Sequence, residues 1–399
     1  MSTDSPALVR LHPHSIKYLQ KGHPWVTKDS FTEKFPPKAT WLEAKQGKHT
    51  WALAHDPQHP HVKARVWKVT EGDRPAAFNF ENDLTTRLVQ AFEKRKNYWT
   101  LNERDHFYLA FGEADLLPGL FVLKLNQVLL IQIKMEFWSQ QSELLKTSIL
   151  TAIKSMPSDF KWIIFESRHD SKRPQRTSWS GGELPASTDI HEFGVKYHLH
   201  WGAHYDHGIY TDMSEIRLKL KPNFKGARVL NLFAYSGAFS LYALQCGATE
   251  VVSVDLSAIY LEWLSENLDL NLQLDKNRHS SLCMSVEKAL AKLASTKAQF
   301  DLVICDPPSF SSDGQKSAPA WEKYPAWINA ITQVLDPGGK MALFLNTHQL
   351  NRGKFKNILI QSVHSRAPLK ILSQWGLSGD TGILKGHPEG DYLKGFLLK

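Results

Sequence analysis

The sequence predicts an α/β protein whose C-terminal half forms a parallel, doubly wound sheet. In residues 196–399, short apolar runs alternate with helical patterns, as where "ARVLNLFAY" is followed by "GAFSLYALQCG". Repeated β–α units of this kind imply parallel strands with helices on both faces. The preceding residues lack this alternation. Residues 5–72 contain short strand-like runs, and residues 75–195 mix helix and strand patterns. We therefore expect three domains with these boundaries.

Residues 5–72 are predicted to form a small β-rich domain, a barrel or a sandwich. In "KARVWKV", Ala64 and Val66 alternate with Arg65 and Trp67, which is the period of a half-exposed strand. The strand-like runs, separated by Gly and Pro, are "GHPWVT" (22–27), "TWLEA" (40–44), "HTWALAHD" (49–56) and "KARVWKV" (63–69).

Residues 75–195 are predicted to form a central α+β domain. Leu84, Leu88 and Phe92 are spaced i, i+4, i+8 and give an opening helix one apolar stripe. Strand patterns, a Pro-Gly turn, a helix near 137–155 and the strand "KWIIFES" follow. The Pro-containing loop "RHDSKRPQRT" (168–177) is basic.

The composition argues against several classes of protein, namely membrane-spanning, disulfide-rich and zinc-binding proteins. No run approaches 18 apolar residues, and the N-terminal residues lack an apolar signal core, so we expect a cytoplasmic protein without a membrane span. The three cysteines are scattered singly, which is too few for a disulfide framework or a zinc site. We therefore expect no metal.

The positive charge is concentrated near the N-terminus. The net charge is +8, and residues 1–72 hold 11 Lys or Arg against 6 Asp or Glu. A basic module on a near-neutral body suggests a polyanionic partner, most simply nucleic acid. A charged, solvated surface without any partner is the alternative.

Polar residues follow the predicted C-terminal strands, where ligands bind in such sheets. Gly237 allows a tight strand-to-helix turn, but no G-x-G-x-x-G pattern or Walker lysine accompanies it. Asp255 follows the second strand and suits two ribose hydroxyls, Glu287 is placed to reach an adenine edge, and Asp306 follows a later strand. Singly, these residues could close a turn, cap a helix or stabilise a helix dipole. Together they favour an adenosine cofactor without a diphosphate, S-adenosylmethionine.

The motifs also resemble a known family. "VLNLFAYSGAFS", "VVSVDLSAIYLEWLSENLDLN" and "FDLVICDPPSFS" look like the motifs of class I methyltransferases, and more narrowly of large-subunit ribosomal RNA base methyltransferases. "GHPWV" and "ARVW" are similar to the PUA domain of the RlmI-like branch, "DLLPGL" and "GELP" to its middle domain, and "HPEGDYLKGF" to its tail. The resemblance implies a PUA-like RNA-binding domain (5–72), a central α+β domain (75–195) and a Rossmann-like catalytic domain (196–399).

The resemblance also implies site residues and partners. The expected partners are ribosomal RNA of the large subunit, 23S by this likeness, and a second copy of the chain in a homodimer. The cofactor residues implied are Tyr210, Asp212, Arg217, Asn231, Phe233, Tyr235, Gly237, Asp255, Leu256, Glu287 and Asp306. The expected RNA contacts are Arg65, Lys94, Arg95, Arg168, Lys172, Arg173 and Arg176.

The target atom depends on whether a cysteine nucleophile is present. The better-known branch of the family makes 5-methylcytosine, which needs a cysteine to add to the ring at C6. Counted from Gly338-Gly339, the matching position here is Asn346, which cannot form that adduct. Cys305 lies within an apolar strand and is more typical of a buried structural thiol.

"HYDHGIYTD" (204–212), "YLEWLSENLDLN", "DPPSFS" and the asparagine after the "GG" strand are more similar to the RlmK-like 7-methylguanosine branch. Guanine N7 has its own lone pair and needs placement and charge stabilisation rather than a covalent catalyst. We expect Asp306 and Asn346 to hold a flipped guanine, Pro307 and Pro308 to stiffen the rim, and Phe310 to stack on the base. A cytosine-C5 enzyme of the RlmI type, a non-catalytic RNA-binding assembly factor and a small-molecule methyltransferase are the alternatives.

Overall fold

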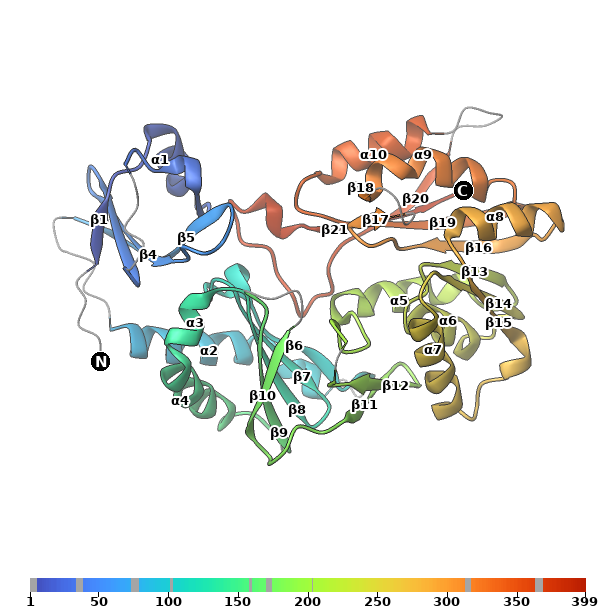
Figure 1. The fold of residues 1–399 in the computed structure, drawn as a ribbon, viewed down its shortest axis with the longest axis horizontal. Helices are drawn as coiled ribbons and strands as arrows, with labels where there is room; N and C mark the ends of the chain where they lie inside the picture. Colours follow the sequence, from blue (N-terminus) through green and yellow to red (C-terminus); the bar gives the residue numbers. More distant parts are fainter. Residues whose placement is uncertain are drawn as a thin grey trace. The chain divides into compact units, whose positions relative to one another are not determined.

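The computed structural model describes residues 6–33, 39–72, 79–100, 103–157, 160–169, 174–202, 204–312, 317–362 and 369–399, with the backbone alone at 310–312 and 317. The chain divides into two compact units. The first holds residues 1–186, 201–205 and 380–390, and the second holds residues 187–200, 206–379 and 391–399. Figure 1 shows the elements of both along the chain.

The first unit contains a five-stranded N-terminal sheet in the order β1-β3-β4-β5-β2. The four predicted strand runs are confirmed, and the strand β1 and helix α1 add to them. The elements are β1 (Ala7–Val9), α1 (Pro13–Gln20), β2 (Trp25–Thr27), β3 (Trp41–Gln46), β4 (His49–His55) and β5 (Val62–Glu71).

From Val62 to Trp67 strand β5 is largely buried on both faces, so the half-exposed pattern predicted there is wrong; the strand becomes partly exposed from Lys68 onward. Ala64 packs in an apolar cluster with Leu42 and Leu53 of the N-terminal sheet. Trp67, on the opposite face and 2% exposed, packs with Leu84 in the core of the following segment. Alternation of small and large apolar side chains here reflects two different cores rather than one core and solvent.

The central segment forms a second sheet in the order β10-β9-β8-β7-β6. The predicted stripe of Leu84, Leu88 and Phe92 is fully buried. The helix expected near 137–155 divides at Gln141 into two shorter helices. The elements are α2 (Phe80–Glu93), β6 (His106–Phe111), β7 (Leu120–Leu125), β8 (Val128–Ile133), α3 (Glu136–Gln140), α4 (Ser142–Ile153), β9 (Trp162–Ser167) and β10 (Gln175–Ser180).

A segment from near the C-terminus completes this first unit. The fully buried Asp380 carboxylate accepts hydrogen bonds from Arg104 Nη2 at 2.8 Å and from the Tyr108 backbone N–H at 2.7 Å. Arg95 Nε donates to the Asp380 carbonyl at 2.6 Å. The three predicted domain ranges stay a prediction, because the first unit takes in both N-terminal segments and part of the tail.

The second unit contains a seven-stranded sheet in the order β15-β14-β13-β16-β19-β21-β20. The first five are parallel, as predicted, whereas β21 runs antiparallel to β19 and the edge strand β20 pairs antiparallel with β21. Its strands are β13 (Arg228–Leu232), β14 (Glu250–Asp255), β15 (His279–Cys283), β16 (Phe300–Cys305), β19 (Leu335–Asn346), β20 (Ile371–Trp375) and β21 (Leu393–Leu398).

Helices cover both faces of this sheet (Figure 1). Helices α8, α9 and α10 lie on one face, and α6 and α7 lie on the other. Two small hairpins, β11–β12 and β17–β18, pair by themselves. The remaining elements are β11 (Ser187–Glu192), β12 (Val195–His200), α5 (Ser214–Leu220), α6 (Ala238–Gln245), α7 (Ala258–Leu270), α8 (Val286–Ser295), β17 (Phe310–Ser312), β18 (Ser317–Pro319), α9 (Ala320–Ile331) and α10 (Arg352–Gln361).

The direction of chain progression reverses between β13 and β16. From β13 the chain proceeds to β14 and β15 on one side, and then returns to β16 and β19 on the other. Such a switch point opens a crevice at the carboxyl ends of the strands. In the described part of the chain, no helix has the length and apolar character needed to cross a membrane.

Candidate active site

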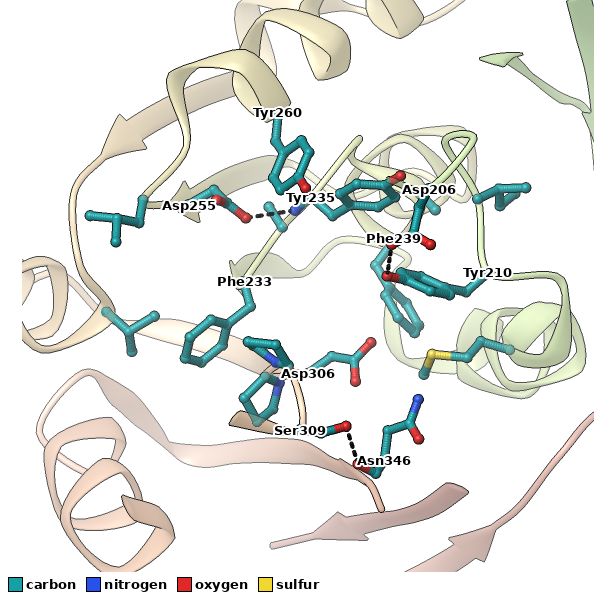
Figure 2. A pocket seen from close by; sticks show the side chains of 18 of the residues that line it. Asp206, Tyr210, Phe233, Tyr235, Phe239, Asp255, Tyr260, Asp306, Ser309 and Asn346 are labelled. Atoms are coloured by element: carbon teal, nitrogen blue, oxygen red, sulfur yellow. Dashed lines mark hydrogen bonds between the residues drawn. The ribbon is translucent and has the colours of Figure 1, made fainter. Parts of the chain in front are cut away.

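A cavity of about 550 Å³ lies at the carboxyl ends of the strands of the second unit. Twelve of the residues predicted for the cofactor or the chemistry line it: Tyr210, Asp212, Arg217, Phe233, Tyr235, Asp255, Leu256, Glu287, Asp306, Pro307, Pro308 and Asn346. This volume lies within the range of small-molecule sites. Figure 2 shows most of these side chains around the cavity.

Four of the lining residues lie at the carboxyl ends of four strands of the sheet. Asp255 ends β14, Phe233 follows β13, Asp306 follows β16 and Asn346 ends β19. Neighbouring strands are about 4.8 Å apart, so Asp255 and Asp306, two strands apart, are separated by roughly 10 Å along the sheet edge. An elongated ligand laid across β13 would therefore reach both carboxylates.

Asp255 is held rigidly by the backbone around it. One carboxylate oxygen accepts from the Tyr235 N–H at 2.9 Å and the other from the Ser257 N–H at 2.9 Å. Burial raises the pKa of Asp255, and these N–H groups oppose that effect. Ser257 caps α7, with its hydroxyl accepting from the Tyr260 N–H. A carboxylate accepts about four hydrogen bonds, so Asp255 retains capacity for two ligand hydroxyls.

The loop after β13 turns sharply beneath the cavity. Phe233, Tyr235 and Gly237 all adopt positive φ, at 61°, 50° and 87°. This conformation is uncommon for aromatic residues and concentrates at functional sites. A Cβ on Gly237 would approach Leu264 Cγ to 2.5 Å, so glycine is required. Gly237 itself does not line the cavity and acts by shaping the turn.

Tyrosine rings form one wall of the cavity. The Tyr235 ring lies 4.7 Å from Tyr260 in an edge-to-face arrangement and 5.5 Å from Tyr210. Tyr210 donates its hydroxyl to Asp206 at 2.8 Å. Figure 2 shows this group on the side of the cavity opposite Asp306 and Asn346.

Glu287 occupies the first turn of α8, capped by Ser285. Trp327 Nε1 donates to its Oε1 at 2.9 Å. Burial opposes ionisation of Glu287, but the bond from Trp327 and other hydrogen bonds outweigh it and lower the pKa of Glu287. An ionised acceptor thus lines this part of the cavity.

Asp306 differs from the other carboxylates because its side chain accepts no hydrogen bond from any residue that the structure describes. Burial and the nearby Asp212 raise the pKa of Asp306 to about 7, against the opposing charge of Arg217. The two prolines that follow line the cavity and have no N–H to offer.

Arg217 and Asp212 are fixed by neighbours. Arg217 is buried and makes a two-fold bond to Glu192 of β11, with Nη2 to Oε2 at 2.8 Å. The Tyr392 hydroxyl donates to Asp212 at 2.5 Å. The carboxylate of Glu192 therefore offsets the positive charge of Arg217. Asp212 remains close to Asp306.

Asn346 faces the same part of the cavity as Asp306 (Figure 2). Its backbone carbonyl accepts from the Ser309 hydroxyl at 2.6 Å. The next residue is fixed by the buried Lys394, whose ammonium donates to the carbonyls of Thr347 and, at 3.1 Å, Tyr392. Burial lowers the pKa of Lys394 to about 8. These contacts hold the backbone at Asn346 and Thr347 in place.

The three cysteines lie outside the lining of the cavity. Cys305 is fully buried in β16, and burial followed by the charge of Asp306 raises the pKa of its thiol. Cys246 ends α6, and Cys283 ends β15 with its sulfur 3.7 Å from the Leu256 carbonyl. The described residues that line the cavity include no cysteine.

One predicted cofactor residue, Asn231, lies outside the lining of the cavity. Its side chain is buried and donates to Ser240 Oγ at 2.8 Å. Its predicted cofactor contact is therefore wrong, and it belongs to the polar interior between β13 and α6. The Phe310 side chain lies outside the described residues, as do Lys172 and Arg173.

Several arginines predicted to contact RNA are engaged inside the protein. Arg65 is buried and pairs with Asp56 at 2.8 Å and Glu113 at 3.2 Å. Arg95 is buried and pairs with Asp115 at 2.7 Å. Direct phosphate contacts predicted for both are wrong, because each guanidinium stabilises the interior of the first unit.

The two described arginines of the basic loop are engaged in the same way. The buried Glu166 carboxylate accepts from Arg168 and, at 2.5 Å, from Arg176. Arg176 also donates to the carbonyls of Gly202, His204 and Tyr205 at 3.0–3.1 Å. Arg168 stacks over the Tyr205 ring at 5.0 Å. Lys94 alone among the described arginines and lysines of that prediction keeps a largely exposed side chain, 61% exposed.

Sequence reasoning missed about half of the lining residues. Asp206 and Ser309 lie within motifs that carry the family resemblance, which was the available signal. Tyr260 lies within another of these motifs, on α7, and had the same signal. The missed residues are Asp206, Ile209, Met213, Ala234, Ala238, Phe239, Tyr260, Ser285, Val286, Ser309 and Leu393.

Known proteins resemble this chain over nearly its whole length. "Ribosomal RNA large subunit methyltransferase I" of Serratia proteamaculans is 29% identical over 395 residues, which is 96% of each chain. A crystal structure of a protein assigned as a methyltransferase, complexed with SAH, superposes with a TM-score of 0.87 at 19% identity over 98% of this chain and 100% of that one. A protein assigned as a SAM-dependent methyltransferase from Streptococcus mutans gives 0.86 at 18% identity, with the same coverage.

The fold shared with these structures is that of class I methyltransferases. The family model of the S-adenosylmethionine-dependent methyltransferases matches residues 115–366, which include the cavity up to Asn346. The free acceptor capacity of Asp255 and the elongated line of polar groups suit that cofactor. The chain belongs to the S-adenosylmethionine-dependent methyltransferases, and S-adenosylmethionine is its cofactor.

Proposed function

We propose that this enzyme methylates a base of large-subunit ribosomal RNA without a cysteine nucleophile, and that guanine N7 is the favoured target. The curated relative from Serratia carries the ribosomal substrate in its name and matches 96% of this chain. The basic N-terminal segment supports a polyanionic partner.

The residues divide the cavity into a cofactor end and an acceptor end. Asp255 would accept the ribose hydroxyls, and Leu256 and Glu287 would border the adenine. The cofactor supplies a methyl group on a sulfonium, an electrophile that needs only an aligned nucleophile. The loop Phe233–Gly237 and Asp306, which border the same cavity, would hold the rest of the cofactor.

The observation that carries the choice of atom is the pair Asp306 and Asn346 at adjacent strand ends, where the described cavity-lining residues include no thiol. Cytosine C5 needs a thiolate that adds to the ring and a base that later removes a proton. Guanine N7 uses its own lone pair and loses no proton, so the ring gains a positive charge. Asp306 would stabilise that charge, and Asn346 would orient the base edge.

RNA contacts are proposed for exposed cations in place of the buried arginines. Arg10, Lys17, Lys21 and Lys28 are exposed on the N-terminal part of the first unit. Replacing the three lysines by Gln should weaken RNA binding and flatten its salt dependence, because fewer counterions are released. Cofactor affinity should not change. An unchanged salt slope would leave these charges as solubilising surface.

The methylated nucleoside that the enzyme produces identifies the base and the atom that it methylates. We expect mass spectrometry of rRNA nucleosides from a deletion strain to show loss of one 7-methylguanosine, and the wild-type product to give an alkali-labile site. Loss of 5-methylcytosine instead, or a covalent complex with 5-fluorocytosine RNA, would contradict the proposal and favour the cytosine-C5 alternative. A chain that binds S-adenosylmethionine but transfers no methyl group to rRNA would support a non-catalytic assembly role.

A further inference from the structure

The cavity has an excess of negative charge that cofactor binding alone does not require. Its lining includes five carboxylates against the cationic side chain of Arg217. That guanidinium is bonded to the buried Glu192, which lies outside the lining, so its charge is offset before any ligand arrives. The carboxylates are Asp206, Asp212, Asp255, Glu287 and Asp306.

Three of these carboxylates are satisfied by local donors. Asp255 accepts two backbone N–H groups, Glu287 accepts the Trp327 indole and Asp206 accepts the Tyr210 hydroxyl. Such bonds stabilise an ionised acid without any ligand charge.

Asp306 has no donor of this kind in the described chain, and its neighbour Asp212 repels it. Asp212 accepts from the Tyr392 hydroxyl, which holds it in place beside Asp306. A partly buried carboxylate without a partner is destabilised unless a cation arrives. The acceptor end of the cavity therefore favours a positively charged ligand.

The two forms of the cofactor differ by one such charge. In the transfer step the bond between sulfur and the methyl carbon breaks, its electron pair stays on sulfur, and a new bond forms from the acceptor atom to the methyl group. The sulfonium thereby becomes a neutral thioether, S-adenosylhomocysteine. Ribose and adenine are identical in both forms.

We propose that Asp306 and Asp212 act as a charge filter, making this cavity bind the methyl donor more tightly than the spent cofactor. The filter rests on the cofactor and not on the identity of the RNA target. A carboxylate about 6 Å from a sulfonium, at an effective dielectric constant of about 20, changes affinity by roughly ten- to a hundredfold. The product is then released partly because its charge has gone.

The filter should depend on pH. The charged and titratable groups facing Asp306 are Asp212, Arg217 of α5 with its partner Glu192, Tyr210, Tyr324 of α9 and the preceding Cys305. With the pKa of Asp306 near 7, the carboxylate is mostly protonated at pH 6 and mostly ionised at pH 8. Affinity for the cationic donor should rise several-fold over that interval, and affinity for the neutral product should stay level.

Titration calorimetry with S-adenosylmethionine and S-adenosylhomocysteine tests the filter directly. Asp306→Asn keeps the shape and removes the charge, so the ratio of the two affinities should fall by about tenfold or more toward one, and the pH dependence should disappear. Asp301→Asn, on the same strand and outside the cavity lining, is the matched control and should keep the wild-type ratio.

Asp212→Asn provides a second variant if Asp306→Asn does not fold, and should lower the ratio in the same direction. Equal weakening of both ligands in these variants would overturn the proposal and leave the carboxylates as hydrogen-bond acceptors. An unchanged ratio would overturn it as well. Neither result bears on the RNA target, because no RNA is present in the assay.

Discussion

Replacement of Asp255 by alanine should weaken both forms of the cofactor equally. The carboxylate is held by the Tyr235 and Ser257 N–H groups at 2.9 Å, and its remaining acceptor sites face the cavity. Losing hydrogen bonds to a charged acceptor costs roughly 1.5–3 kcal/mol, which is about ten- to a hundredfold in affinity. The ribose is common to donor and product, so the affinity ratio should not change.

Calorimetry with both ligands, together with the melting temperature of the ligand-free protein, measures this effect. Asp269→Ala is the matched control, because Asp269 lies on α7 with an exposed side chain that pairs with Lys276. It should bind both ligands as the wild type does. If Asp255→Ala binds S-adenosylmethionine as tightly as the wild type, then Asp255 serves the Tyr235 loop alone and the ribose assignment is wrong.

Three further substitutions distinguish residues that take part in methyl transfer from residues that stabilise the fold. Asn346→Ala should lower turnover roughly ten- to a thousandfold with unchanged cofactor affinity, since the carboxamide orients the acceptor; a loss of cofactor affinity instead would move Asn346 to the cofactor end. Cys305→Ala should keep methyl transfer within a few-fold in a steady-state assay, whereas complete loss would restore the cysteine mechanism. Arg176→Ala should lower the free energy of unfolding by about 3 kcal/mol, because it leaves the buried Glu166 with fewer partners; an unaltered denaturation midpoint with weaker RNA binding would restore its predicted RNA contact.

The strand-end residues were predictable because parallel sheets bring their carboxyl ends to one edge. Asp255, Asp306 and Asn346 each follow or end a strand that the apolar runs indicate, and the structure places all three around one cavity. Asn231 misled because it lies within β13 rather than after it, and side chains within a buried strand point into the interior between sheet and helix.

The RNA contacts were the least predictable part. Net charge counts every arginine, but it does not reveal which guanidinium has a buried carboxylate nearby. Arg65 meets Asp56 across nine residues of sequence, and Arg176 meets Glu166 through the pairing of β9 with β10. Tertiary pairing therefore removes these arginines from the surface, and only the fold shows which cations remain outside.

The placement of Asp380 constrains how the chain can fold during synthesis. Arg104 and the Tyr108 N–H receive their buried carboxylate from a residue 276 and 272 positions later. Until the ribosome has made that segment, these donors cannot bind Asp380, and contacts between such distant residues form slowly. We infer that completion of the first unit waits for nearly the whole polypeptide, although its own strands are made early.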